Sequence, residues 1–182
     1  MSNSQITKLA LADSMKDLME EKAMTKITIA DITKSCNLSR KSFYYHFKDK
    51  FDLVNWIFYT EFVSVVQKTS SPDIWELLER ICEYLYKNKV FYCNALKVRG
   101  QNSFSDYFIE VLEPFMLINF GNKLENHEDK EFFSIYFADA TRAAITRWLI
   151  EDKDISPKKF VELTRTAMEG IAVKVIEDIK EE

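Results

Sequence analysis

Glycine and proline, the residues at which chains most readily make sharp turns, each occur only three times among the 182 residues of this chain. A sheet whose strands are joined by tight hairpins normally needs more of both residues. The scarcity therefore favours an all-α fold. A hydrophobic content of 47% over this length is enough for one good core, with room for a small second domain.

Apolar residues recur at three- and four-residue steps along most of the chain, which is the spacing of an amphipathic helix. The first such segment runs from Gln5 to about Lys22. Pro114 interrupts the apolar segment 107–120, so we expect a kink or two shorter helices there. The other predicted helices cover about residues 28–36, 40–47, 49–68, 72–86, a stretch around 91–98, 129–152 and 157–179.

The sequence shows no sign of a membrane or secretory protein. No apolar run approaches the roughly 18 residues of a membrane span, and the N-terminus lacks the basic and apolar regions of a signal peptide. Cys36, Cys82 and Cys93 are odd in number, widely spaced and form no CxxC pair, so we expect reduced thiols. These features predict a cytoplasmic protein without a membrane partner.

Two short helices separated by a sharp turn are predicted close to the N-terminus. Thr28 opens the first helix, and Asp31 stands where it completes a capping box. Asn37 then supplies the positive φ that the turn needs, because asparagine tolerates this conformation better than other non-glycine residues. Ser39 is a natural N-cap for the second helix, which begins at Arg40. Together these signals predict a helix-turn-helix.

The second of these helices has one face for the core and one that suits DNA. Phe43 and Phe47 lie four residues apart and so share the core face. The remaining surface carries cationic, hydroxyl and phenol side chains, which suit phosphate oxygens and base edges. These side chains are Arg40, Lys41, Ser42, Tyr44 and Tyr45. The free N–H groups and positive dipole end at the helix N-terminus also suit phosphate.

Charge is divided unevenly along the chain. Residues 1–50 hold nine Lys and Arg against six Asp and Glu, a net charge of +3. Residues 51–182 hold sixteen against twenty-three, a net charge of −7. A basic head on an acidic body is expected when one end of a protein meets a polyanion. A solvated helix face would also explain the basic cluster, so charge alone leaves both interpretations open.

An enzyme is not favoured. The histidines are His46, in the predicted recognition helix, and His127, in a polar segment. The sequence contains no HExxH or GxSxG motif, no phosphate-binding glycine loop and no paired cysteines. We therefore expect no catalytic residues, no cofactor and no metal site. A helical adaptor that does not bind DNA stays open as an alternative. A test of binding to promoter DNA would separate such an adaptor from a DNA-binding regulator.

Residues 6–60 resemble the TetR family of bacterial transcription regulators. The resemblance lies in ITIADIT at 27–33, in NLSRKSFYYHFKDKFDL at 37–53 and in Trp56. Family members more often carry glycine at the position of Asn37, a difference that the tolerance of asparagine for positive φ makes harmless.

This resemblance implies roles in DNA binding. It places Arg40, Lys41 and Ser42 at base-reading positions. Tyr44 and Lys50 match phosphate contacts. Thr28, at the start of the first short helix, can touch the DNA backbone, and Tyr45 and His46 lie beside Tyr44. The full set of predicted DNA-binding residues is Thr28, Ser39, Arg40, Lys41, Ser42, Tyr44, Tyr45, His46 and Lys50.

The resemblance also implies an architecture and partners. A three-helix helix-turn-helix DNA-binding domain over residues 1–50 would be joined by a long fourth helix to a larger helical effector-binding and dimerisation domain over 51–182. The partners would be double-stranded operator DNA, a second copy of the chain and an unknown small-molecule or protein effector. We predict an effector-responsive repressor. The alternative is an activator of the same family whose C-terminal domain responds to a protein partner.

The last two predicted helices are dense in small residues, which let helix backbones approach closely. Ordinary packing within one domain would explain this pattern. The resemblance favours instead a four-helix dimer interface made by two such pairs of helices. The predicted interface residues are Ala140, Ala144, Trp148, Leu163, Ala167 and Ile171.

The middle helices are rich in aromatic residues, most of which would form the core. A few polar side chains among them could orient an effector. Asp139 and Arg142 stand three residues apart and could instead pair only with each other. The predicted pocket residues are Arg99, Gln101, Asn102, Tyr107, Tyr136, Asp139 and Arg142. Residues 91–107 and 146–154 more loosely resemble the C-terminal type of TetR-like regulators of dihydroxyacetone kinase operons, which implies neither a ligand nor a sign of regulation.

Overall fold

A computed structural model describes residues 3–66, 73–100, 102–118, 129–151 and 154–181. Within these ranges all of the regular secondary structure is helical, which confirms the all-α prediction. None of the described helices is long and apolar enough to cross a membrane.

Contacts group the chain into two compact units. The first comprises residues 1–68 and 88–107, and the second comprises residues 69–87 and 108–182. The functional boundary predicted after residue 50 stays a prediction. Each unit has a buried apolar core of its own.

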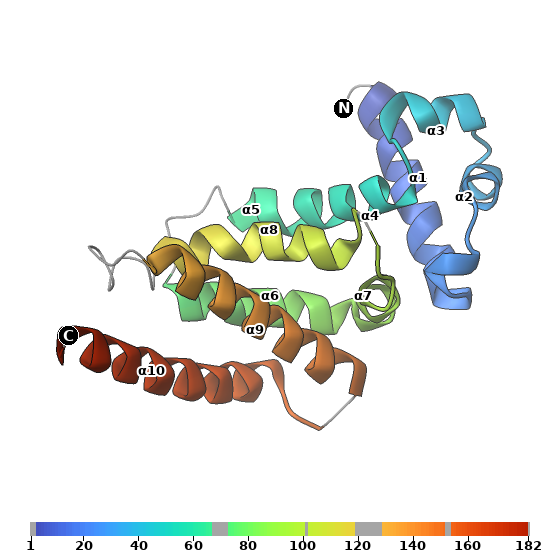
Figure 1. Ribbon diagram of the computed structural model, residues 1–182. Coiled ribbons are helices and arrows are strands. Elements are labelled where there is room, and N and C mark those ends of the chain that lie inside the picture. Colours follow the sequence, from blue (N-terminus) through green and yellow to red (C-terminus); the bar gives the residue numbers. More distant parts are fainter. Residues whose placement is uncertain (1–2, 67–72, 101, 119–128, 152–153, 182) are drawn as a thin grey trace. The chain divides into compact units, whose positions relative to one another are not determined.

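The first unit begins with a group of short helices. They are α1 (Asn3–Glu21), α2 (Ile29–Ser35), α3 (Arg40–His46) and α4 (Lys50–Phe58), with a 3₁₀ turn at Met24–Lys26. Figure 1 shows α1, α2 and α3 crossing one another, and α1 contacts all three of the others. Leu11, Met15 and Met19 recur every four residues on α1 and are at most 1% exposed, which gives this helix its core face.

The helix that follows α3 is less regular than predicted. We expected one α-helix to about residue 68, but α4 ends at Phe58. It is followed by a π-helical turn at Tyr59–Val63 and by α5 (Ser64–Val66). Hydrogen bonds in a π turn span five residues instead of four. Because the apolar residues continue through this turn, their spacing did not reveal it.

The rest of the first unit packs aromatic rings against α4. Helix α7 (Lys89–Leu96) and the beginning of α8 (Phe104–Met116) belong to this unit. The ring centroid of Phe58 lies 5.8 Å from that of Tyr92 and 5.3 Å from that of Phe104. All three side chains are at most 1% exposed. Such edge-to-face contacts add to the stabilisation from burial.

The second unit is built around three helices. They are α6 (Ile74–Lys87), α9 (Lys130–Glu151) and α10 (Pro157–Glu181), and α10 contacts both of the others (Figure 1). The N–H of Lys159 donates to Ser156 Oγ at 3.3 Å, which confirms the predicted cap of α10. Trp148 on α9 is 5% exposed and stacks on Phe160 with ring centroids 4.7 Å apart.

A kink or two shorter helices were expected at Pro114, and the division is not present, because α8 continues through Pro114 to Met116. Proline removes one backbone donor, so the carbonyl of Glu110 lacks its helical partner. Both Glu110 and Pro114 lie on the exposed side of the helix, where water can satisfy that carbonyl. The polar segment around His127, which follows α8 in the sequence, lies almost wholly outside the described residues.

Candidate nucleic-acid interface

A reciprocal pair of hydrogen bonds fixes the N-terminus of α2. The N–H of Asp31 donates to Thr28 Oγ1 at 3.2 Å, and the N–H of Thr28 donates to the Asp31 carboxylate at 2.9 Å. This is the predicted capping box. Lys22, just beyond α1, forms an ion pair with the same carboxylate at 3.2 Å. Thr28 lies at the surface.

These contacts lower the pKa of Asp31. Hydrogen bonds from Thr28 and the interaction with Lys22 stabilise the carboxylate and lower its pKa from an ordinary 3.8 to about 2. Since the pKa is lower in the folded chain, the charged carboxylate stabilises the fold at pH values above the ordinary pKa. That contribution is lost as the pH falls through about 2.

Asp31→Asn is expected to remove part of this acid sensitivity. Asparagine does not take up a proton, so the free energy of unfolding should vary less between pH 3.8 and about 2 than it does in the wild type. Lys22→Met removes only one of the two partners and should give an intermediate pH dependence. Urea unfolding followed by circular dichroism at several pH values measures this. Identical pH dependence in all three proteins would contradict a role for the cap.

The turn between α2 and α3 has the predicted geometry. Asn37 has a φ of 55°, in the left-handed region that asparagine tolerates. The N–H of Leu38 donates to the carbonyl of Thr33 at 2.8 Å, and the N–H of Asn37 donates to that of Lys34 at 3.3 Å. Two carbonyls at the end of α2, where the helix itself runs out of donors, thereby gain partners.

Helix α3, the predicted recognition helix, begins with a serine cap. Ser39 Oγ accepts the N–H of Ser42 at 3.0 Å, which confirms the predicted N-cap. The hydroxyl oxygens of Ser39 and Ser42 lie 2.9 Å apart, within hydrogen-bonding distance. Ser42 would therefore approach a base with a hydroxyl that already has one partner. Arg40 and Lys41 are both exposed.

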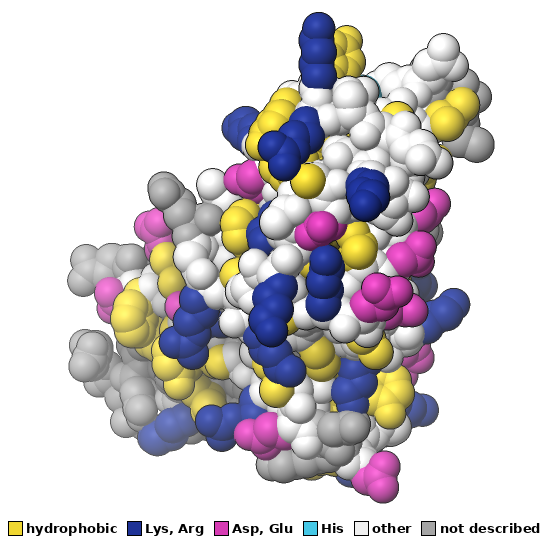
Figure 2. Space-filling model, turned by 90° about the vertical axis from the view of Figure 1, so that its right-hand side faces the viewer, with side chains coloured by type: hydrophobic (Ala, Val, Ile, Leu, Met, Phe, Trp, Pro, Cys, Tyr) yellow, Lys and Arg dark blue, Asp and Glu magenta, His cyan; other side chains and the backbone are white. Residues whose placement is uncertain are grey.

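The two faces of α3 differ as predicted. Phe43 is 0% exposed and Phe47, its C-cap, is 3% exposed, whereas Tyr44 is 59% and Tyr45 82% exposed. His46 is half-buried, and its ring meets that of Tyr45 edge-on with centroids 4.9 Å apart. Figure 2 shows Lys and Arg side chains spread over the side of the molecule where α2 lies, interspersed with Asp and Glu. Exposed rings and cations therefore share the solvent face of α3.

Lys50 has a different environment from the cations of α3. Its ammonium group donates to the carbonyl oxygens of Met24 and Ile27 at 2.8 Å each, and to that of Thr25 at 3.5 Å. Burial lowers the pKa of Lys50, and the nearby Asp49 carboxylate partly opposes this shift. The phosphate contact stays a prediction, and it would require the ammonium group to leave these carbonyls.

The sequence patterns did not point to Asn94, which lies on α7. Its amide nitrogen donates to the carbonyls of Met19 and Lys22, at 3.0 Å and 2.9 Å, and its amide oxygen accepts the N–H of Met24 at 2.8 Å. One signal could have revealed it. A single amide side chain within the apolar run of α7 needs hydrogen-bond partners if that face of the helix is covered.

The predicted effector residues of the first unit are mostly at the surface. Arg99 and Asn102 are exposed, and Tyr107 is half-buried. Gln101 lies outside the described residues. Their role in binding an effector stays a prediction.

The remaining predicted effector residues belong to α9 in the second unit. Arg142 forms an ion pair with Asp139 at 3.6 Å, so the pairing that the sequence left open does occur. Tyr136 is 49% exposed and lines a groove with residues of the predicted dimer face. Among the residues that the structure describes, no His, Cys, Asp and Glu side chains cluster in a way that could hold a metal ion.

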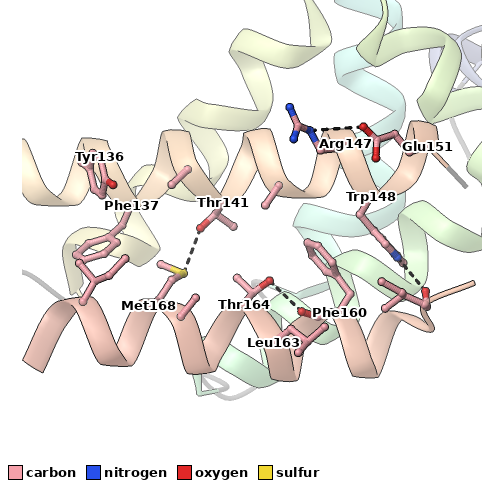
Figure 3. Close-up of a pocket in the computed structure, with 15 residues that line it drawn as sticks. Tyr136, Phe137, Thr141, Arg147, Trp148, Glu151, Phe160, Leu163, Thr164 and Met168 are labelled. Atoms are coloured by element: carbon pink, nitrogen blue, oxygen red, sulfur yellow. Dashed lines mark hydrogen bonds and ion pairs between the residues drawn. The ribbon is translucent and has the colours of Figure 1, made fainter. Parts of the chain in front are cut away.

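A groove of about 440 Å³ runs between α9 and α10 (Figure 3). All six residues predicted for the dimer interface line it, namely Ala140, Ala144, Trp148, Leu163, Ala167 and Ile171. The Thr141 hydroxyl, 3.5 Å from the sulfur of Met168, links the two helices. Leu163 is 50% exposed and Ile171 46% exposed, so the groove has large apolar side chains that the protomer leaves uncovered.

Two family descriptions match this chain. "Bacterial regulatory proteins, tetR family" matches residues 13–57, which include the capped α2, the Asn37 turn and α3. "Transcriptional regulator C-terminal region" matches residues 73–170, more than half of the chain.

Individual relatives agree with these matches. The HTH-type dhaKLM operon transcriptional activator DhaS of Lactococcus lactis subsp. lactis is 30% identical over 152 residues, which cover 81% of this chain and 75% of DhaS. The solved structure of a dihydroxyacetone kinase operon activator DhaS is 23% identical, with a TM-score of 0.63 over 94% of this chain and 97% of that one. A TetR transcriptional regulator from Streptococcus agalactiae is 20% identical, with a TM-score of 0.68 over 90% and 94%. These two structures share the fold described above.

Proposed function

This chain belongs to the TetR family of bacterial transcription regulators, and we propose that it acts as a homodimer whose two α3 helices read an operator. It is a DNA-binding transcriptional regulator. The observation that supports the assignment to α3 is its division into a buried Phe43–Phe47 face and an exposed face. The exposed face carries Arg40, Lys41 and Tyr44.

Each exposed group on α3 has a distinct proposed role. Arg40 and Lys41 lie in the first turn, where side chains of a recognition helix reach base edges in the major groove. Tyr44, one turn further along, offers its phenol hydroxyl to a phosphate oxygen. Thr28 stands at the exposed start of α2 and would contact the DNA backbone. Such a protein acts where the chromosome is, in the cytoplasm.

The groove between α9 and α10 supports the homodimer. A second copy of the same pair of helices would cover Leu163 and Ile171, which are about half exposed in one protomer. The alanines that line the groove would let the two backbones approach. A two-fold dimer would present two recognition helices to half-sites about one turn of DNA apart.

Repression in response to an unknown small-molecule or protein effector is the first candidate for the sign of regulation. Activation is the second candidate, because the relative that is 30% identical over 81% of this chain is a transcriptional activator. An effector of either kind acts only if it binds the dimer more tightly when the two recognition helices are in one arrangement than when they are in another. Repression and activation can be separated by a reporter placed under a promoter that the protein binds. Its expression is compared in cells with and without the gene for this protein.

Tyr44→Phe tests the proposed phosphate contact. Loss of one neutral hydrogen bond should weaken binding by roughly two- to tenfold. The factor should be similar for an operator duplex and for a scrambled duplex, because a phosphate contact carries no sequence information. Fluorescence anisotropy with both labelled duplexes measures the two affinities.

Tyr59→Phe is the matched control for this variant. It removes the same hydroxyl from another exposed tyrosine, on the π turn after α4, and should leave both affinities at the wild-type value. If Tyr44→Phe weakened operator binding alone, Tyr44 would read a base instead. If neither affinity changed, Tyr44 would have no contact with DNA.

A further inference from the structure

The connection between α1 and α2 contains backbone groups that the two helices cannot satisfy by themselves. The last carbonyls of a helix have no partner within it. Between Glu21, where α1 ends, and Ile29, where α2 begins, only Met24 and Ile27 are buried, each 1% exposed. The residues next to these two, Ala23, Thr25 and Lys26, are exposed. Packing alone therefore gives this connection few points of attachment.

Asn94 supplies one attachment from α7. Its side chain accepts the N–H of Met24 and donates to the carbonyls of Met19 and Lys22. Both amide hydrogens and the amide oxygen are thus used, at distances of 2.8 to 3.0 Å. A residue 70 positions further along the chain therefore fixes the end of α1 and the residue that opens the 3₁₀ turn.

Lys50 supplies the other attachment from the start of α4. Its ammonium group donates to the carbonyls of Met24 and Ile27, with a longer contact to Thr25. The three N–H donors of a lysine are thereby matched by three carbonyls. Met24 is therefore held through its N–H by Asn94 and through its carbonyl by Lys50.

These contacts determine where α2 begins. Ile27, whose carbonyl Lys50 holds, directly precedes Thr28, the N-cap of α2. Helix α2 in turn packs against the recognition helix α3. A shift of this connection would therefore displace the helix-turn-helix from α1 and α4.

We propose that Lys50 and Asn94 are positioning residues for DNA binding, which fix the α1–α2 connection so that α3 meets the major groove correctly. Lys50 does this in place of a phosphate contact. The inference depends on the proposed function, because it assigns these residues a part in DNA reading by α3.

The salt dependence of binding separates the two roles of Lys50. A phosphate contact contributes about 0.9 to the slope of log affinity against log salt, whereas a residue that binds carbonyls contributes nothing. Lys50→Met keeps the aliphatic length of the side chain but removes all three donors. It should weaken operator binding by roughly tenfold or more, with the wild-type salt slope. Lys41→Ala, on the proposed base-reading face, should weaken binding to the operator much more than binding to a scrambled duplex.

Asn94→Ala is the second variant, and it removes no charge. It should also weaken operator binding at an unchanged salt slope. Hydrogen exchange at the Met24 amide should become faster, because that N–H loses the amide oxygen of Asn94 as its acceptor. Lys97→Met, which removes an exposed lysine at the end of α7, is the charge control and should behave as wild type. Circular dichroism at the assay temperature shows that each variant is folded.

Two results would overturn the inference. One is a salt slope that falls by about one in Lys50→Met, because Lys50 would then contact phosphate. The other is wild-type operator affinity in Asn94→Ala despite faster exchange at Met24, because the connection would then not matter for DNA binding. If Lys41→Ala left operator affinity unchanged, the proposed function of α3 would be wrong instead.

Discussion

Ala167→Glu is expected to convert the dimer into a folded monomer. Ala167 lines the groove between α9 and α10, where a second protomer would bring apolar side chains against it. A carboxylate enclosed there without a partner would lose several kcal/mol of hydration, which is a large share of the binding free energy of a typical dimer. Sedimentation velocity at micromolar concentration should show a single monomeric species, and circular dichroism should show unchanged helix content.

A neighbouring residue provides the control for this variant. Thr166 is exposed on α10 but does not line the groove, so Thr166→Glu should remain dimeric. Ala144→Glu and Ala143→Glu make a second pair on α9, because Ala144 lines the groove and the exposed Ala143 does not. Dimers in both Ala167→Glu and Ala144→Glu would place the interface on another surface.

Loss of the dimer should also weaken DNA binding. A dimer engages two half-sites at once, and the second contact benefits from a high effective concentration, which can raise the overall affinity by about 10² to 10⁴. Ala167→Glu should therefore bind a two-half-site duplex much more weakly than wild type. On a duplex with one half-site the two proteins should bind with similar affinity.

The features of the helix-turn-helix that the sequence predicted correctly are local. The Thr28–Asp31 capping box and the Ser39 cap each depend on residues three positions apart, and the positive φ of Asn37 depends on that residue alone. The buried and exposed faces of α3 follow from helical spacing alone. Such features can be predicted because the residues that decide them are adjacent in the chain.

The features that the sequence did not reveal depend on contacts between distant residues or on small irregularities. Lys50 and Asn94 both hold Met24, from 26 and 70 positions away, and no local pattern links these residues. The π turn at Tyr59–Val63 continues an apolar pattern that suits an α-helix equally well. Pro114 was expected to kink or divide α8, and α8 is not divided. Water can satisfy the exposed carbonyl of Glu110, which loses its helical donor.

The dimer face and the effector residues differ in how well the sequence located them. The six predicted dimer residues come together along one groove because small and apolar residues on two adjacent helices share one face of each. Polar residues predicted for an effector had no such periodicity. Asp139 and Arg142 pair with each other, which gives a structural reason for their presence.

Arg40→Ala and Lys41→Ala are expected to relax the choice of DNA sequence. Each side chain is exposed in the first turn of α3, and a good bidentate contact to a base discriminates by roughly 1–3 kcal/mol. Operator affinity should therefore fall by about tenfold or more for each lost base contact. Binding to a scrambled duplex should fall much less. Lys97→Ala removes an equal charge from an exposed site on α7 and should alter neither affinity.

Selection of bound duplexes from a random library tests the proposed reading of DNA by α3 most directly. The wild type should enrich two similar half-sites in inverted orientation, centred about one helical turn, or 10 base pairs, apart. Arg40→Ala and Lys41→Ala should each lose the preference at the same position in both half-sites. Enrichment of no sequence, or of a site whose base preferences are identical in wild type and both variants, would contradict the assignment of DNA reading to α3.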